Sequence, residues 1–317
     1  MLRHIARLVT ASVLLSALAL SSAVLAGCTT SAGPMSTIRV PATTESESTL
    51  VAPANPARSA ATATPAAAAA KKPKTPKPSS ASTGTAALSN RLLAWNFQRN
   101  KKHTVPSIPS EARRLAKQYD AMYVGPDPKL VYLTFDEGYE NGNTPKILDA
   151  LKRNDVHATF FVSGEFCREA PKLCRRMLAE GHVVGNHSNT HPSMPSVTSD
   201  RRRFEAQFTK TDASFKKATG QPLTRLFRPP MGEYSARSLA MTEQLGYTSV
   251  FWSFAHVDYD EKHQPPVSTT VSRVLAGSHP GAIFLLHGMS TSDTGALDEI
   301  IKGLRTQGYE FGTLEPR

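Results

Sequence analysis

The feature that most constrains the fold is a regular alternation of apolar segments with amphipathic segments between residues 110 and 314. Strands are expected at 131–136, 158–164, 182–188, 224–230, 248–254, 281–287 and 309–314. Helices are expected at 111–123, 145–154, 171–181, 201–219, 236–246, 267–277 and 298–308, with Ser110 and Thr144 as the N-caps of the first two. Unbroken apolar strands that alternate with helices are typical of a parallel sheet with both faces covered. We therefore expect an α/β fold, a distorted (β/α) barrel that is closed or nearly closed.

The first 28 residues have the pattern of an export signal. Arg3 and Arg7 give a basic start, and residues 8–25 form an apolar run with few polar interruptions. The run ends in small residues followed by Cys28, which resembles the bacterial lipobox and implies cleavage before Cys28 and lipidation of that residue. The alternatives are an uncleaved membrane anchor, for which the run is short, and secretion with a free cysteine.

Residues 29–90 are rich in Ala, Thr, Ser and Pro and have few apolar side chains large enough to build a core. This composition predicts a disordered linker, so one globular domain is expected over 91–317. A lipidated Cys28 would tether that domain to the cell membrane or outer membrane, in an extracytoplasmic location.

The net charge of +11 is concentrated in the N-terminal part of the chain. Residues 1–90 carry eight basic and two acidic side chains, which leaves the globular part only mildly basic. No basic run is interleaved with aromatic residues, which argues against a nucleic-acid partner. An anionic envelope polymer or a membrane surface fits this charge better.

Ionisable side chains occur where the expected strands end. Each strand is apolar up to that point, and the groups that follow are Asp136, His187, His191, Arg228, Asp258 and His287. The carboxyl ends of parallel barrel strands meet at one mouth, so these side chains are expected to converge on a single site.

His187 and His191 are spaced like ligands of a divalent metal, usually zinc, with a carboxylate nearby. The alternative is a pair of surface histidines. Ser188 stands where a zinc peptidase of the HExxH kind would carry its glutamate, which argues against that class. The sequence also lacks the GxSxG motif of a nucleophile-elbow hydrolase.

Five short motifs occur in order along the chain: TFDEG (134–138), HSNTH (187–191), RPPMG (228–232), DY (258–259) and LLH (285–287). They resemble the five motifs of the polysaccharide deacetylases, the fourth carbohydrate esterase family with its NodB-like domain. The longer phrases DEGYENGNTPKIL, RPPMGEYS, FWSFAHVDY and HPGAIFLLH are similar to the branch that removes the acetyl group of muramic acid on the route to muramic δ-lactam. This closer resemblance covers about residues 95–314.

The resemblance implies an acid and a base for amide hydrolysis. Asp136 would be the general base that takes a proton from metal-bound water, and Arg228 would keep it ionised. His287 would be the acid that protonates the leaving amine, and Asp258 would orient His287 and raise its pKa.

The resemblance also implies a metal site. His187 and His191 would hold the ion, and the backbone N–H of Met231 would help to stabilise the oxyanion. The family's third ligand is an aspartate, but this chain has Glu137, which is one methylene longer and either reaches the metal or points away. Trp252 and Leu285 are expected in the pocket wall or the core.

Cys167 and Cys174 are too far apart to bridge within one continuous helix. Pro171 is expected to begin a helix, so Cys167 can fold back from the preceding turn. A disulfide and two buried thiols therefore both remain open for a protein outside the cytoplasm.

These features favour a metal-dependent hydrolase of linear amide bonds in peptidoglycan amino sugars, with N-acetylmuramic acid as the expected target. Two alternatives remain: a deacetylase of N-acetylglucosamine polymers and a catalytically inactive, membrane-tethered glycan-binding protein. Glu137 is the one feature that favours the inactive protein.

Overall fold

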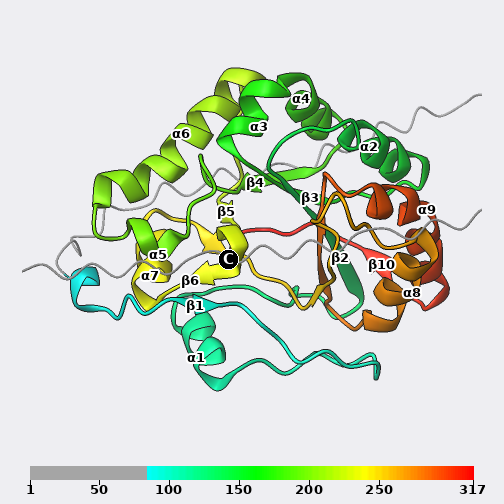
Figure 1. Cartoon of the computed structure of the whole chain (residues 1–317), viewed down its shortest axis with the longest axis horizontal. Helices are drawn as coiled ribbons and strands as arrows, with labels where there is room; N and C mark the ends of the chain where they lie inside the picture. Colours follow the sequence, from blue (N-terminus) through cyan, green and yellow to red (C-terminus); the bar gives the residue numbers. More distant parts are fainter. Residues whose placement is uncertain (1–83) are drawn as a thin grey trace, which may run out of the picture. The chain divides into compact units, whose positions relative to one another are not determined.

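The computed structural model describes residues 84–317, which belong to the second of two compact units, 71–317 (Figure 1). The predicted signal peptide, Cys28 and most of the predicted stem lie outside the described residues. Within the described part, no helix is long and apolar enough to cross a membrane.

A curled parallel sheet forms the centre of this unit. Its strands lie in the order β7 (Thr248–Ser249), β5 (Leu226–Phe227), β4 (Val183–Asn186), β3 (Thr159–Val162), β2 (Leu130–Glu137), β9 (Ile283–His287) and β8 (Phe254–Ala255). The strand β10 (Glu310–Phe311) pairs with the start of β2, and every ladder in this sheet is parallel. A separate antiparallel pair joins β1 (Leu93–Ala94) to β6 (Glu233–Tyr234).

Helices cover the outer face of the curled sheet. Helices α6 (Arg201–Thr219), α4 (Pro171–Ala179), α2 (Thr144–Arg153), α9 (Thr291–Thr306) and α8 (Val267–Gly277) contact one another in that order around the sheet (Figure 1). The remaining helices are α1 (Ser110–Gln118), α3 (Gly164–Glu169), α5 (Met194–Val197), α7 (Ala236–Gln244) and the 3₁₀ turns η1 (Thr85–Ala87) and η2 (Pro230–Gly232). The main core lies between sheet and helices, where Phe135, Phe160 and Phe284 are fully buried with the apolar sides of α2 and α9.

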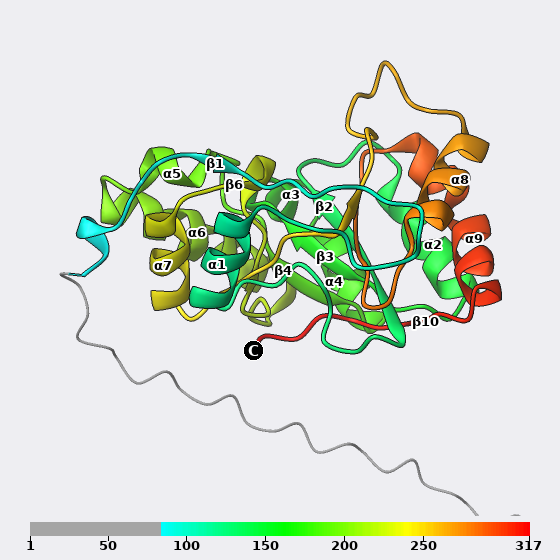
Figure 2. The ribbon, with the colours of Figure 1, turned by 90° about the horizontal axis from the view of Figure 1, so that it is seen from below.

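The sheet is open between β7 and β8, and the segment around Met122 lies across this opening. Met122 N–H donates to the Ser249 carbonyl at 2.7 Å, and Phe251 N–H donates to the Met122 carbonyl at 2.7 Å. This insertion divides the strand expected at 248–254 into two short ones. The expected distorted (β/α) barrel is confirmed as a curled sheet that is closed on this side by irregular chain (Figure 2).

Some predicted helix ends were wrong. Helix α9 begins at Thr291 rather than 298, because the Ser290 hydroxyl accepts a hydrogen bond from Asp293 N–H and caps the helix seven residues earlier. Pro109, not Ser110, occupies the cap position of α1. Helices α6 and α8 have the predicted bounds.

Candidate active site

The carboxyl ends of the central strands open into a cavity of about 680 Å³. Among its lining residues are Asp136, His187, His191, Met231, Trp252 and His287. These six residues come from five strand ends or the loops that follow them, so the expected convergence on one mouth is present in the structure.

The register of β2 and β9 places the two candidate proton-transfer groups side by side. Asp136 pairs with His287 in the parallel ladder, next to Phe135 paired with Leu286. Asp136 is 8% exposed, and the side chain of His287 is 22% exposed. Both groups therefore face the cavity from neighbouring strands, with limited access to water.

Arg228 holds Asp136 from behind. It follows β5 and is fully buried, and its Nη1 donates to Asp136 Oδ1 at 2.8 Å and to Thr134 Oγ1 at 2.7 Å. The guanidinium also stacks over the Phe161 ring at 4.1 Å. Burial alone would raise the pKa of Asp136, but the charge and hydrogen bond of Arg228 together with the nearby His187 and His287 outweigh it, so the pKa is lowered and the carboxylate stays ionised.

The two histidines of the HSNTH loop lie together on the cavity wall. His187 Nδ1 donates to the Arg228 carbonyl at 2.8 Å, which leaves its Nε2 3.6 Å from Asp136 Oδ2. The ring centroids of His187 and His191 are 4.9 Å apart. Ser188 and His191 both have positive φ, of 67° and 53°, and this uncommon backbone turns both imidazoles toward the cavity.

Both imidazoles are suited to hold a divalent ion. Burial lowers the pKa of His187 to about 4 and also lowers that of His191, so both rings are neutral at neutral pH. A neutral ring whose other nitrogen is tied to a carbonyl is the form in which histidine binds metals.

Glu137 does not join this pair. It is fully buried, its Oε2 accepts a hydrogen bond from Thr144 Oγ1 at 3.1 Å, and it packs against Gly288 rather than lining the cavity. Successive side chains of a strand point to opposite faces, so Glu137 points away from the face that carries Asp136. This position does not suit a metal ligand, and burial raises the pKa of Glu137 well above its usual value.

His287 is paired with a second carboxylate, that of Asp258. Its Nδ1 donates to Asp258 Oδ1 at 2.9 Å and its backbone N–H donates to Asp258 Oδ2 at 3.0 Å. Burial would lower the pKa of His287, but the charge and hydrogen bond of Asp258 together with the charge of Asp136 outweigh it, so the pKa is raised. His287 is therefore held in its protonated form over a wider pH range than a free imidazole.

The other predicted residues of the site lie as follows. Met231, with φ of 57°, is exposed at the cavity rim. Trp252 and Leu285 also line the cavity, and Leu285 is buried. Cys167 and Cys174 lie outside this cavity as buried free thiols, and a hydrogen bond with Cys174 together with burial raises the pKa of Cys167.

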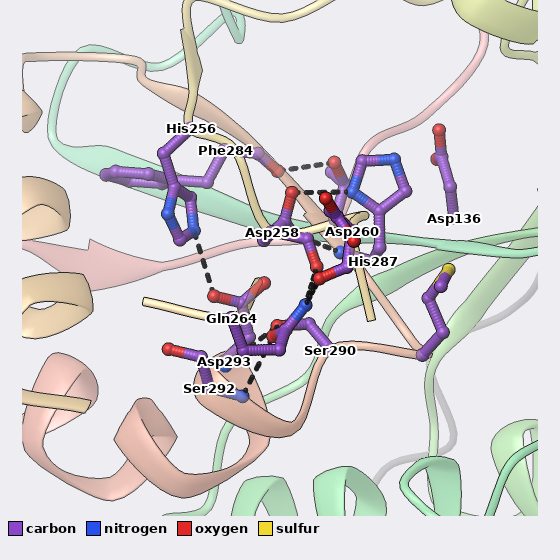
Figure 3. A network of polar contacts seen from close by, with 12 residues as sticks. Asp136, His256, Asp258, Asp260, Gln264, Phe284, His287, Ser290, Ser292 and Asp293 are labelled. Atoms are coloured by element: carbon purple, nitrogen blue, oxygen red, sulfur yellow. Dashed lines mark hydrogen bonds and ion pairs between the residues drawn. The ribbon is translucent and has the colours of Figure 1, made fainter. Parts of the chain in front are cut away.

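Sequence reasoning missed two buried residues behind His287. Asp293, in the first turn of α9, lies beside Asp258, and His256 Nε2 is 2.9 Å from Asp293 Oδ1 (Figure 3). His, Cys, Asp and Glu side chains can ligate metals. Among the described residues, His256, Asp258 and Asp293 are the one group of three of these side chains whose potential ligand atoms lie within 4.8 Å of one another. The Ser290-x-x-Asp293 spacing, typical of a helix start, was the signal that could have found Asp293.

Comparison with known proteins identifies the family. The model of the polysaccharide deacetylase family matches residues 124–250. A peptidoglycan-N-acetylmuramic acid deacetylase of Bacillus subtilis is 40% identical over 230 residues, which are 72% of this chain and 87% of that protein. The chain belongs to the polysaccharide deacetylase family. An uncharacterized 30.6 kDa protein of Geobacillus stearothermophilus is 46% identical over 235 residues, 74% of this chain and 88% of that protein.

Solved structures of polysaccharide deacetylases have the same fold. The structure of a family 4 carbohydrate esterase from Bacillus subtilis superposes with a TM-score of 0.69 at 39% identity, covering 71% of this chain and 96% of that one. The family and the curled (β/α) fold expected from the sequence are thereby confirmed.

Proposed function

We propose that this polysaccharide deacetylase is a metal-dependent hydrolase of the N-acetyl group of peptidoglycan amino sugars, with N-acetylmuramic acid as its target. The observation that carries the proposal is the cavity where an ionised Asp136, a neutral histidine pair and a carboxylate-paired His287 face one another. The similarity to the Bacillus subtilis muramic acid deacetylase supports the choice of sugar.

Asp136 is the group that accepts a proton from water. Arg228 keeps its carboxylate ionised and fixed, with Oδ1 bonded to Arg228 and Oδ2 directed toward His187. A water held there loses a proton to Asp136 as its oxygen adds to the acetamide carbon. The backbone N–H of Met231, which also lines the cavity, stabilises the negative charge that develops on the carbonyl oxygen.

His287 supplies the second proton. As the C–N bond breaks, the amine nitrogen takes the proton from His287, and acetate and a free amino sugar are formed. Asp258 holds the ring in place through Nδ1, so the other ring nitrogen is the one that gives up the proton to the substrate.

His187 and His191 are the residues that would hold the metal, and we propose zinc, which imidazole ligands suit. When bound, a divalent ion there lowers the pKa of water and polarises the acetamide carbonyl. Glu137 is left out of this ligand set because its carboxyl group packs against Thr144 and Gly288.

We also propose that a lipid on Cys28 tethers the enzyme outside the cytoplasm, on the cell membrane or the outer membrane. Metabolic labelling with a fatty-acid analogue, followed by fractionation, tests this proposal. Label and membrane association should both be lost in a Cys28→Ser variant. Unchanged membrane association of that variant would contradict it.

Acetate release from purified peptidoglycan, with mass spectrometry of the products, tests the proposed activity. We expect loss of acetyl from muramic acid, on intact glycan or on glycan stripped of its stem peptides, and the same spectra test for lactam. Asp136→Asn and His287→Ala should each lower turnover by about two orders of magnitude or more, whereas Asp298→Asn, at an exposed site on α9, should not.

Two results would count against the proposal. Loss of acetyl from glucosamine alone would assign the enzyme to the other sugar. Normal glycan binding without acetate release, in the presence of zinc, would indicate an inactive binding protein.

A further inference from the structure

Behind the catalytic histidine lies a chain of buried polar groups that the proposed mechanism does not use. From the cavity inward it consists of His287, Asp258, Asp293 and His256 (Figure 3). Asp258 and Asp293 are each 1% exposed, and His256 is 4% exposed. Two carboxyl groups and two imidazoles therefore share a region with almost no access to water.

The hydrogen bonds around Asp258 and Asp293 leave one proton to be assigned. Both oxygens of Asp258 accept from His287, at 2.9 and 3.0 Å. Asp293 Oδ1 faces His256 Nε2 at 2.9 Å, while Asp293 Oδ2 has no hydrogen-bond partner among the described residues. One carboxyl oxygen of Asp293 lies within 4.8 Å of one of Asp258, and two carboxyl groups this close can share a hydrogen bond only if one of them carries a proton.

That proton belongs on Asp293. Asp258 is stabilised as an anion by His287, whereas burial and the Asp258 charge raise the pKa of Asp293 well above its usual value. The Ser290 hydroxyl and the backbone N–H of His287 favour ionised Asp293, but they are outweighed. Two adjacent buried carboxyl groups cannot both ionise without a large cost.

The other charged groups near His287 and His256 are consistent with a proton on Asp293. His287 is also exposed to the charges of Asp136 and Arg228, and His256 to those of Arg99 and Arg273. Burial lowers the pKa of His256, so it is neutral and its Nε2–H donates to Asp293. Its Nδ1 has no hydrogen-bond partner among the described residues, which agrees with a neutral ring protonated only at Nε2.

We propose that Asp293 is a positioning residue that works as a neutral carboxylic acid, donating a hydrogen bond to Asp258 and accepting one from His256. This arrangement fixes the Asp258 carboxylate against His287 without adding a second negative charge beside it. The inference rests on the proposed deacetylase function, because it assigns to Asp293 the task of holding the acid that protonates the leaving amine.

Two substitutions at Asp293 distinguish a neutral hydrogen-bonding acid from a charged carboxylate or a residue with no positioning role. Asparagine keeps a donor toward Asp258 and an acceptor toward His256 and carries no charge, so Asp293→Asn should keep kcat within about twofold of the unsubstituted enzyme. Alanine removes both bonds, so Asp293→Ala should lower kcat by about tenfold or more with KM changed by less than about twofold. Asp298→Asn is the matched control, since this exposed residue lies on the same helix.

A second measurement does not depend on activity. Titration of His287 by NMR in histidine-labelled holoenzyme should give the same pKa in Asp293→Asn as in the unsubstituted protein, and a different pKa in Asp293→Ala. If the unsubstituted protein releases no acetate, the proposed function fails, whereas this titration still decides the state of Asp293.

Three outcomes overturn the inference. A His287 pKa that shifts equally in both variants shows that Asp293 carries a charge. Full activity and an unshifted pKa in a folded Asp293→Ala variant show that Asp293 does not position Asp258. A second equivalent of bound metal that is lost in both variants shows that His256, Asp258 and Asp293 hold an ion rather than a proton.

Discussion

Arg228 and Asp136 form a buried ion pair in which Nη1 lies 2.8 Å from Oδ1, and the arginine is fully buried. The same nitrogen also reaches Thr134, so a single guanidinium joins the strand β2 to the end of β5. The pair holds together two segments that are 92 residues apart in sequence, and it keeps the Asp136 carboxylate ionised.

Arg228→Lys should therefore damage activity more than a change of one basic residue for another suggests. A lysine cannot reproduce the planar fork or the stacking on Phe161, so Asp136 becomes less well held and its pKa rises. We expect kcat/KM to fall by about two orders of magnitude, with the acidic limb of its pH profile at higher pH. Steady-state assays across pH measure both effects.

Arg225→Lys is the control for this substitution. Arg225 lies just before the same strand, is half-exposed and pairs with Asp212 away from the cavity. An equal loss of activity in both variants would mean that Arg228 has only a general structural role.

The pH dependence of the enzyme follows from the opposite pKa shifts of Asp136 and His287. In the proposed mechanism the active form has an ionised Asp136, whose pKa is lowered from 3.8, and a protonated His287, whose pKa is raised from 6.5. We expect a bell-shaped kcat/KM profile whose basic limb lies above pH 6.5. Asp258→Asn removes the negative charge beside His287, so the pKa of His287 should fall and the basic limb should move to lower pH. If the basic limb does not move, it reports the ionisation of a group other than His287.

The same shifts affect stability in opposite directions. The pKa of His287 is raised in the folded state, so its contribution is complete below pH 6.5 and is lost as pH rises through the folded pKa. The pKa of Asp136 is lowered, so its contribution is present above pH 3.8 and is lost as pH falls through the folded pKa.

Much of the fold could be predicted because it depends on hydrophobic periodicity. The apolar strands and the long helices have the expected order, and α6 and α8 have the expected ends. The division of the strand expected at 248–254 could not be predicted, because it depends on Met122, more than a hundred residues earlier in the chain. Local sequence carries no information about which distant backbone fills an opening.

The site, too, could be predicted only in part, because some of its features depend on local sequence and others on where strands and helices end. Polar side chains at strand ends predict a common mouth, and Asp136, His187 and His287 do meet there. The orientation of Glu137 depends on whether β2 continues through that residue, which the Glu-Gly break in the sequence concealed. Asp293 was missed because the start of α9 was placed too late in the chain.

Glu137→Gln tests the interpretation of this residue as a buried neutral acid. Its pKa is raised in the folded state, so the contribution of Glu137 to wild-type stability is greatest below pH 4.5 and falls as pH rises toward the folded pKa. Glutamine does not titrate, so the variant should gain about 1.4 kcal/mol relative to wild type for each pH unit within that window. Denaturant unfolding at several pH values measures the difference.

Metal content supplies the control for Glu137→Gln. The variant should bind as much zinc as wild type, because Glu137 lies outside the cavity. A loss of zinc would show that Glu137 moves to the metal.

Cys167 and Cys174 are free thiols, so we expect the stability of the protein not to depend on a disulfide between them. Both side chains are buried, so in a Cys28→Ser variant a thiol reagent should find none in the folded state and two after denaturation. The melting temperature should be the same with and without reductant. A count of zero after denaturation, restored to two by reductant, would instead establish a disulfide between them.

His187→Gln and His191→Gln should each remove zinc and activity while the protein stays folded. Both rings line the cavity, so their loss leaves a small opening rather than a core defect.

Because burial lowers the pKa of His187 to about 4, zinc should stay bound at neutral pH and be released as the solution is acidified toward that value. Elemental analysis after dialysis at stepped pH, with acetate release in parallel, measures this. Asn189→Asp, in the same loop between the two rings, is the control and should keep its zinc. Full activity in chelator-treated, zinc-free wild type would show that Asp136 and His287 hydrolyse the acetamide without an ion, and the histidine pair would then have another role.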